Sequence, residues 1–249
     1  MYSNTIKVKS SKGIRISVLI IAHNEEKYIA ESIKSVLNQS KHPDEIVLVV
    51  HNSTDKTLEI AKSFPISVIP FNGPAGIINA RLEGLKNVSG DIILCIDGDS
   101  VAQKNWVEVM SATLQHKKNV LVGSWVKFRG TIFGNIYNIF NKHACRLNNE
   151  KTTYWIWGSS HAFWSKDINL IREILTKSTP LSSNLHLPRN PEDYWLALFM
   201  SKHGNLKVTN KTWVTPYSKD PSSWREFLRR KESVKNRNLI KDYFQKNFI

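Results

Sequence analysis

The sequence predicts an α/β fold with a single doubly wound, mostly parallel sheet. Short apolar runs over residues 16–22, 45–50 and 92–96 have the length and aliphatic content of buried strands. Segments with helical spacing separate these runs at short intervals, which is typical of parallel strands joined by right-handed crossovers. With 41% hydrophobic residues in a chain of 249, we expect one large domain with at most a small extension.

Helix-starting residues and turn residues mark the other elements of the first half. Asn24 can cap a helix over residues 25–38, in which Ile29, Ile33 and Val36 recur at helical spacing. The remaining predictions are a helix from caps at residues 53–55 to about residue 64, a strand over residues 67–70, a Gly/Pro-rich loop over residues 72–76 and a helix over residues 77–87.

The second half is less regular, and its elements are harder to assign. The predicted helices span residues 105–116 and 193–202, and the predicted strands span residues 120–128, 206–209 and 212–214. Residues 131–147 are ambiguous, with a helix covering the sheet as one interpretation. Residues 154–164 are rich in aromatic side chains, and the chain after residue 222 is basic and compatible with a helix.

Charge and cysteine content narrow the classes of partner and compartment. Thirty-five basic residues against 21 acidic ones give a net charge of +14, which favours nucleotide phosphates, anionic lipid head groups or nucleic acid as partners. The two cysteines, Cys95 and Cys145, form neither a disulfide framework nor a metal-binding pattern, as is typical of a reducing compartment. Without a run of about 18 apolar residues, we expect a cytoplasmic protein, peripheral at most on the inner face of a membrane.

The tripeptide Asp97-Gly98-Asp99 directly follows the apolar run over residues 92–96. In extended chain the two carboxylates would face the same way, about 7 Å apart, at the sheet edge where α/β proteins bind ligands. Gly98 would let a ligand approach the backbone. Paired carboxylates suit Mg²⁺ or Mn²⁺, which in turn can hold a diphosphate. The alternative is a solvated Asp-Gly turn.

Four sequence blocks, in order, resemble the family 2 glycosyltransferases. They are the opening strand and asparagine turn at residues 17–25, the second strand and "STDGT"-like loop at residues 45–57, the "ARNxG…GD"-like segment at residues 80–91 and the late "ED"-like motif at residues 191–194. The resemblance covers about residues 16–215. It implies a nucleotide-sugar-binding fold and an enzyme that moves one sugar, with inversion, from a nucleoside diphosphate to a hydroxyl acceptor in glycan, polysaccharide or glycolipid synthesis.

The resemblance also implies a donor site with Mn²⁺ or Mg²⁺ as cofactor. Asp99 would bind the metal, with Asp97 beside it and nearer the ribose. The residues expected to bind the nucleotide sugar are Ala22, His23, Glu25, His51, Asn52, Arg81, Asp97, Gly98 and Asp99. A UDP-sugar is the expected donor, although His51 stands where an aspartate that pairs with uracil is common; a neutral histidine can still accept one hydrogen bond. His51 could instead have a capping or surface role, and Arg81 could be a solvated helix residue.

Asp193 is the candidate general base. Following Pro191 and Glu192, it would stand in the first turn of a helix, where the helix dipole favours the ionised carboxylate that accepts a proton. The alternative is that Glu192 and Asp193 only complement that dipole. Trp157, Gly158 and Glu192 fall where the family builds its acceptor side, and the aromatic side chains there could equally be core.

These expectations divide the chain into a flexible basic arm (1–13), a nucleotide-sugar-binding half (14–128), an acceptor and catalytic-base half (129–218) and a basic helical tail (219–249). The tail lacks the QxxRW motif of processive synthases. It could meet a lipid-linked acceptor on an anionic membrane, or simply be solvated.

Two other classes of function stay open. A sugar-nucleotide-forming nucleotidyltransferase is disfavoured because the turn at residues 23–27 has no glycine. A nucleic-acid-binding protein would use the positive charge but would leave Asp97-Gly98-Asp99 unexplained.

Overall fold

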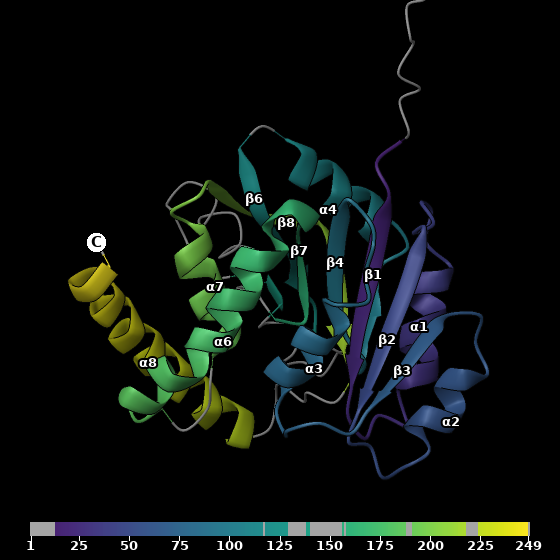
Figure 1. Cartoon of the computed structure of the whole chain (residues 1–249), viewed down its shortest axis with the longest axis horizontal. Helices are drawn as coiled ribbons and strands as arrows, with labels where there is room; N and C mark the ends of the chain where they lie inside the picture. The colour runs from purple at the N-terminus through teal and green to yellow at the C-terminus, as the bar shows by residue number, and fades with distance from the viewer. Residues whose placement is uncertain are drawn as a thin grey trace, which may run out of the picture.

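The computed structural model describes residues 13–116, 118–128, 138–139, 156, 158–187, 191–217 and 224–248, with backbone only for residues 224–234. The described strands form one sheet in the order β3-β2-β1-β4-β7-β6-β8-β5 (Figure 1). The strands are β1 (Ile16–Ala22), β2 (Glu45–His51), β3 (Ser67–Phe71), β4 (Ile92–Asp97), β5 (Ser100–Ala102), β6 (Asn119–Val126), β7 (Ser160–Trp164) and β8 (Asn205–Pro216).

Most neighbouring strands run parallel, as predicted. Strands β1 to β4 pair in parallel with one another, and β6 pairs in parallel with β8. The exceptions are β7, antiparallel to both β4 and β6, and β5, antiparallel to β8. The doubly wound α/β prediction is therefore confirmed, with one antiparallel strand inside the sheet.

Helices cover both faces of the sheet, which explains why the central strands read as continuous apolar runs. The helices are α1 (Ile29–Leu37), α2 (Thr57–Lys62), α3 (Ile77–Gly84), α4 (Trp106–Gln115), α6 (Ile168–Asn184), α7 (Glu192–Met200) and α8 (Trp224–Phe248), with a 3₁₀ turn, η1 (Ser165–Asp167). Alternate residues of β1 face two different cores: Ile20 packs with α1, α2 and α4, whereas Leu19 packs with α3, α6 and α7.

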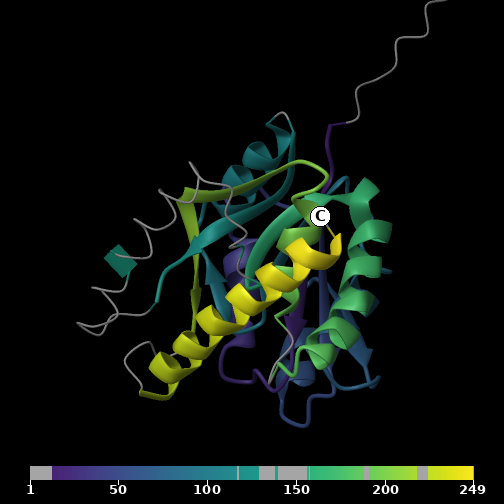
Figure 2. The ribbon, with the colours of Figure 1, turned by 90° about the vertical axis from the view of Figure 1, so that its left-hand side faces the viewer.

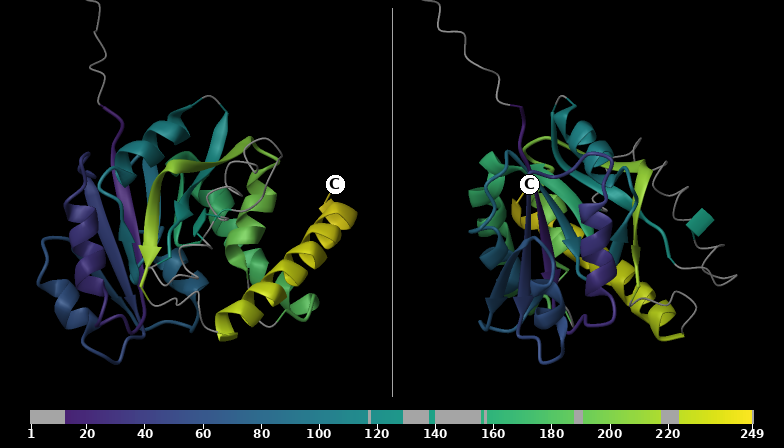
Figure 3. Two further views of the ribbon diagram at one scale, coloured as in Figure 1. Left: turned by 180° about the vertical axis from the view of Figure 1, so that it is seen from behind. Right: turned by 90° about the vertical axis from the view of Figure 1, so that its right-hand side faces the viewer.

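Helix α8 lies outside these layers. The left view of Figure 3 shows it away from the sheet, on the side of α6 and α7, and in Figure 2 it crosses in front of the other elements. Its Ile240 and Phe244 are buried against Trp195 and Leu198 of α7. Among the described residues, every helix is too short or too polar to cross a bilayer.

Strand register brings the predicted donor-side residues to one edge. Ile21 of β1 lies opposite Asp97 of β4, and Ala22 lies opposite Val50 of β2. The residues that follow these strands, including His23 and Asn52, therefore emerge side by side at the carboxyl edge.

Several local predictions need correction. Helix α1 begins at Ile29 rather than residue 25 and has no side-chain cap, because Asn24 accepts a hydrogen bond from the Thr54 N–H (2.8 Å) and joins two loops instead. Strand β4 ends at Asp97 and the chain turns at Gly98, so strand alternation does not set the directions of the two carboxylates. The two short strands expected over residues 206–209 and 212–214 are one strand, β8.

The sequence interpretation missed β5, β7 and α6. Of the ambiguous segment over residues 131–147, only residues 138 and 139 lie within the described part of the chain.

The Gly90-Asp91 pair joins the start of β4 to the start of β1. The Ser17 hydroxyl accepts from the Gly90 N–H (2.8 Å), and the Asp91 carboxylate accepts from the Arg15 N–H (2.8 Å). A side chain on Gly90 would begin 2.6 Å from the Ser17 backbone nitrogen. The Gly90-Asp91 pair therefore has a structural role. Position 90 requires glycine because its backbone lies too close to that of Ser17 to leave room for a side chain.

We expect Gly90→Ala to lower the free energy of unfolding by about 1–3 kcal/mol through overpacking against backbone atoms. Gly13→Ala is the matched control, since a Cβ there meets nothing within 4 Å and should change stability by less than about 0.5 kcal/mol. Urea denaturation measures both variants. Equal effects would show that the backbone approach at Gly90 is not limiting.

Candidate active site

A cleft of about 300 Å³ opens at the carboxyl ends of β1, β2 and β4. It is lined by Ile21, His23, Glu25, His51, Asn52, Ala75, Gly76, Ile77, Asp97, Gly98 and Asp99. The cleft thus brings together all but two of the residues expected to bind the nucleotide sugar. The two that do not line it are Ala22 and Arg81.

Ala22 belongs to the core beneath the cleft, where it is 1% exposed. A Cβ on Gly98 would lie 2.8 Å from the Ala22 Cβ and 3.1 Å from the Ile21 carbonyl oxygen. The Gly98 N–H donates to that same carbonyl (2.8 Å). Glycine is therefore required at position 98 by the neighbouring strand, a reason that the sequence did not reveal.

Both histidines of the cleft are held by contacts of their ring nitrogens. His23 Nδ1 lies 2.7 Å from the His51 carbonyl oxygen, to which it donates. His51 Nε2 lies 3.0 Å from the Pro74 carbonyl oxygen and 3.1 Å from the Asn52 Nδ2, so the loop over residues 72–76 and Asn52 both fix the ring. The His51 ring is buried and stacks on Phe71 with centroids 5.4 Å apart. An ordinary surface role for His51 is excluded by this burial.

The loop before α3 forms one wall of the cleft. From the sequence, this loop was expected only to connect two elements. Gly76 has φ +115°, a backbone region that favours glycine. Beside it, Ile77 is 39% exposed and presents an apolar side chain to the cleft. The glycine and proline content of residues 72–76 was the available signal for a ligand-facing loop.

Arg81 lies behind Asp97 and is 4% exposed, which rules out the solvated-arginine interpretation. Its Nη2 donates to the Gly158 carbonyl (3.0 Å) and lies 3.6 Å from both Asp97 Oδ1 and Glu192 Oε1. One guanidinium therefore joins a residue of the cleft to two residues predicted for the acceptor side.

Burial and charge act in opposite directions on these groups. Burial alone would lower the pKa of Arg81, but the Glu192 and Asp97 carboxylates outweigh it and raise the pKa, so the guanidinium stays charged. Burial raises the pKa of Glu192 to about 7 although Arg81 opposes the shift; neighbouring Asp193 also raises it. Glu192 therefore holds its proton more strongly than an exposed glutamate does.

Asp193 stands in the first turn of α7, as predicted. Its Oδ2 accepts from the Gly158 N–H (3.1 Å) and its Oδ1 accepts from the Tyr194 N–H (2.8 Å). Gly158 thus binds Asp193 through its N–H and Arg81 through its carbonyl. Trp157, the third residue predicted for the acceptor side, lies outside the described residues.

Asp99 is 5% exposed and is held in the turn that follows β4. Its Oδ1 accepts from the Ser100 hydroxyl (3.0 Å), and its carbonyl accepts from the Tyr217 N–H (2.7 Å). Within the described ranges, no three or more His, Cys, Asp or Glu side chains gather as a metal site. Asp97 and Asp99 nevertheless fit Mg²⁺ or Mn²⁺, because such ions are commonly held by one or two carboxylates and completed by phosphate and water oxygens.

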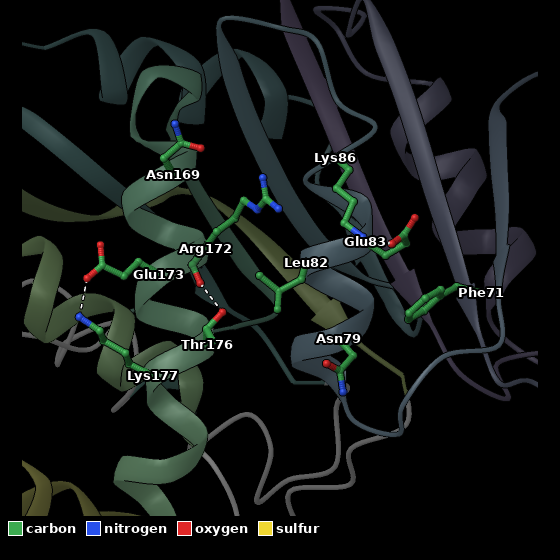
Figure 4. A pocket seen from close by; sticks show the side chains of 10 residues that line it. All are labelled: Phe71, Asn79, Leu82, Glu83, Lys86, Asn169, Arg172, Glu173, Thr176 and Lys177. Atoms are coloured by element: carbon green, nitrogen blue, oxygen red, sulfur yellow. Dashed lines mark hydrogen bonds and ion pairs between the residues drawn. The ribbon is translucent and has the colours of Figure 1, made fainter.

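A second cavity, of about 540 Å³, lies between α3 and α6 (Figure 4). Four of its charged side chains form two pairs, Lys86 with Glu83 (2.7 Å) and Lys177 with Glu173 (2.5 Å). It contains none of the residues predicted from the sequence, so the cleft at the strand ends is the candidate active site.

Glu192 should give a defined pH dependence of stability. Its pKa of about 7 in the folded protein exceeds the usual 4.5, so between these values the folded chain binds a proton that the unfolded chain has released. The contribution of Glu192 to stability therefore falls as pH rises through this window. We expect the free energy of unfolding of Glu192→Gln, taken relative to that of the wild type, to be larger at about pH 8 than at about pH 5. Urea denaturation at the two pH values measures this difference. Glu59→Gln, at an exposed position on α2, should show no such gain; a similar gain there would contradict the assignment.

Comparisons of sequence place the chain among glycosyltransferases. It is 28% identical over 181 residues to glycosyltransferase GlyG of Streptococcus pneumoniae, covering 68% of this chain and 60% of the relative. It is 34% identical over 118 residues to an uncharacterized glycosyltransferase of Haemophilus influenzae, covering 45% of this chain and 36% of the relative. The chain thus spans about a third to three fifths of the length of these relatives.

Comparisons of structure show the same fold. A mannosyltransferase from Pyrobaculum calidifontis, solved with GDP-Man and Mn²⁺, aligns with a TM-score of 0.60 at 16% identity, covering 85% of this chain and 59% of that one. Glucosyl-3-phosphoglycerate synthase from Mycobacterium tuberculosis, solved with Mn²⁺, UDP and phosphoglyceric acid, aligns with a TM-score of 0.55 at 21% identity, covering 80% and 69%. The model of glycosyl transferase family 2 matches residues 17–175, well over half of the chain, and the protein therefore belongs to that family.

Proposed function

We propose that this protein transfers one sugar from a nucleoside diphosphate sugar to a hydroxyl acceptor, with inversion at the anomeric carbon. The observation that carries the proposal is the connection from Asp97 through Arg81 to Gly158 and on to Asp193. The cleft would suit a nucleoside diphosphate, and the Asp193 carboxylate would suit a general base. Only Arg81 and Gly158 separate Asp193 from Asp97 of the cleft along this connection.

The cleft would hold the donor. Asp97 and Asp99 would bind Mn²⁺ or Mg²⁺, which when bound neutralises the developing charge of a diphosphate leaving group. The nucleobase would lie against His23, His51 and Asn52, which line the cleft at the ends of β1 and β2. We retain a UDP-sugar as the first expectation, and the solved relatives hold GDP-Man in one case and UDP in another.

Asp193 would remove the proton from the acceptor hydroxyl. Its carboxylate is half-buried, and two backbone N–H groups hold it in place, one from Gly158 and one from Tyr194. A base held in this way is already oriented for proton transfer. A single base and direct attack on the anomeric carbon give inversion, whereas retention through a covalent intermediate would need a second, nucleophilic carboxylate.

The acceptor would be a glycan or a lipid-linked sugar in polysaccharide or glycolipid synthesis. The protein would act in the cytoplasm. Exposed Lys235, Lys241 and Lys246 on α8 support contact with an anionic membrane surface. Membership of family 2 favours neither of the alternatives that the sequence left open, the nucleotidyltransferase and the nucleic-acid-binding protein.

We expect Asp99→Ala to abolish sugar transfer together with metal-dependent donor binding, because half of the carboxylate pair is lost. Calorimetric titration with UDP, GDP or dTDP, with and without Mn²⁺, measures binding, and a screen of nucleotide sugars for metal-dependent hydrolysis measures turnover. Metal-dependent donor binding that persists in Asp99→Ala would contradict the assigned metal site.

Asp193→Asn should separate binding from chemistry. The amide cannot accept the acceptor proton as the carboxylate does, so transfer should fall about 10²- to 10⁴-fold while donor affinity stays close to that of the wild type. Asp242→Asn, at an exposed position on α8, is the control and should transfer normally. Wild-type transfer by Asp193→Asn would show that another group is the base.

A further inference from the structure

We propose that Arg81 is a positioning residue that holds the catalytic base in place, and that it is not a ligand of the donor. This inference rests on the proposed function, because it concerns how Asp193 is oriented for proton transfer. It differs from the role that the family resemblance implied for Arg81, which was direct contact with the nucleotide sugar.

The burial of Arg81 argues against donor contact. The side chain is 4% exposed and does not line the cleft. Asp97 lies between the two: it lines the cleft, and its carboxylate is also 3.6 Å from the Arg81 guanidinium. A donor in the cleft would therefore meet Asp97, with Arg81 behind it.

The oxygens around the Arg81 guanidinium come from three separate segments. They belong to Asp97 at the end of β4, to Gly158 just before β7 and to Glu192 in the first turn of α7. All three lie within 3.6 Å of Nη2, while the Nε and Nη1 groups are buried without a hydrogen-bond partner among the described residues. The three contacts therefore converge on one nitrogen, which the rigid guanidinium plane holds in place, whereas a lysine ammonium sits on a flexible stem and would not keep that position.

Gly158 forms hydrogen bonds with both Arg81 and Asp193 and so links the two side chains. Its carbonyl accepts from Arg81 Nη2 (3.0 Å), and its N–H donates to Asp193 Oδ2 (3.1 Å). A Cβ on Gly158 would lie 3.1 Å from Arg81 Nη2 and 3.5 Å from the Asp193 Cβ. A side chain there would press on both partners, so glycine keeps the connection short.

Loss of these contacts would affect catalysis by moving the Asp193 carboxylate away from the acceptor hydroxyl. A displacement of a catalytic group by about 1 Å can cost about 10²-fold in rate. Loss of the Arg81 contacts would free Gly158 and the first turn of α7 to shift relative to β4. The donor would still bind in the cleft, but the base would no longer meet the acceptor hydroxyl correctly.

Two variants test the proposal, Arg81→Lys and Gly158→Ala, each in the full chain. We expect both to bind the nucleoside diphosphate that the wild type binds with Mn²⁺, chosen from UDP, GDP and dTDP, with an affinity within about threefold and a stoichiometry of about one. We expect kcat for transfer to fall at least about tenfold in each. A merely structural defect would lower the binding stoichiometry and leave the kcat of the folded fraction unchanged.

Either of two results would overturn the proposal. A loss of nucleotide affinity of about tenfold or more in Arg81→Lys, with little loss in Gly158→Ala, would make Arg81 a donor ligand. A wild-type kcat in both variants would show that the connection does not position the base.

A failure of the proposed function itself would look different, because the wild type would then neither bind nucleotide nor transfer sugar. In that case the Arg81–Glu192 contact is tested through stability alone. We expect the urea midpoint of the double variant Arg81→Lys, Glu192→Gln to differ from the value obtained by adding the effects of the two single variants at the same pH, and additive effects would overturn the contact.

Discussion

A guanidinium that is removed from water must be surrounded by oxygens that compensate for its charge, and this constraint links the two halves of the molecule. Arg81 on α3 meets that requirement through Nη2, which lies close to oxygens of Asp97 in β4, of Gly158 two residues before β7 and of Glu192 in α7. Breaking any of these contacts would leave a buried charge less compensated, which is costly. The cleft at the strand ends and the helix that carries Asp193 are therefore held to one another by electrostatics as well as by packing.

The same constraint explains the unusual state of Glu192. A buried carboxyl is raised in pKa by the loss of water, and Arg81 offsets only part of that effect. Asp193, one residue further along, is instead half-buried and held by backbone N–H groups. Two adjacent carboxyl groups in one helical turn thus have different surroundings, with Glu192 facing the arginine and Asp193 facing the backbone of Gly158.

The sequence predicted the first half of the fold well, because strands such as β1 and β4 are buried on both faces and therefore read as unbroken apolar runs. It failed where that signal is absent: β5 has three residues, β7 begins with polar Ser160 and His161, and α6 contains Pro180. Seven of the nine residues predicted to bind the donor line one cleft, because the carboxyl ends of parallel strands lie at the same edge of the sheet. The burial of Arg81 could not be foreseen, since it depends on contacts between segments as distant as Gly158 and Glu192. Ile77 was missed because nothing in the sequence distinguishes an apolar residue that lines a cleft at the start of a helix from one that packs in the core.

The backbone hydrogen bond from Tyr217 to Asp99 has a consequence for the carboxyl-terminal helix. Tyr217 is fixed beside Asp99, one of the two predicted metal ligands, and α8 begins at Trp224, seven residues later. A chain of that length spans at most about 25 Å when fully extended. If α8 is anchored on a membrane, as proposed, its first residue stays within that distance of Tyr217, and the anchor would hold the cleft at the strand ends close to the membrane surface.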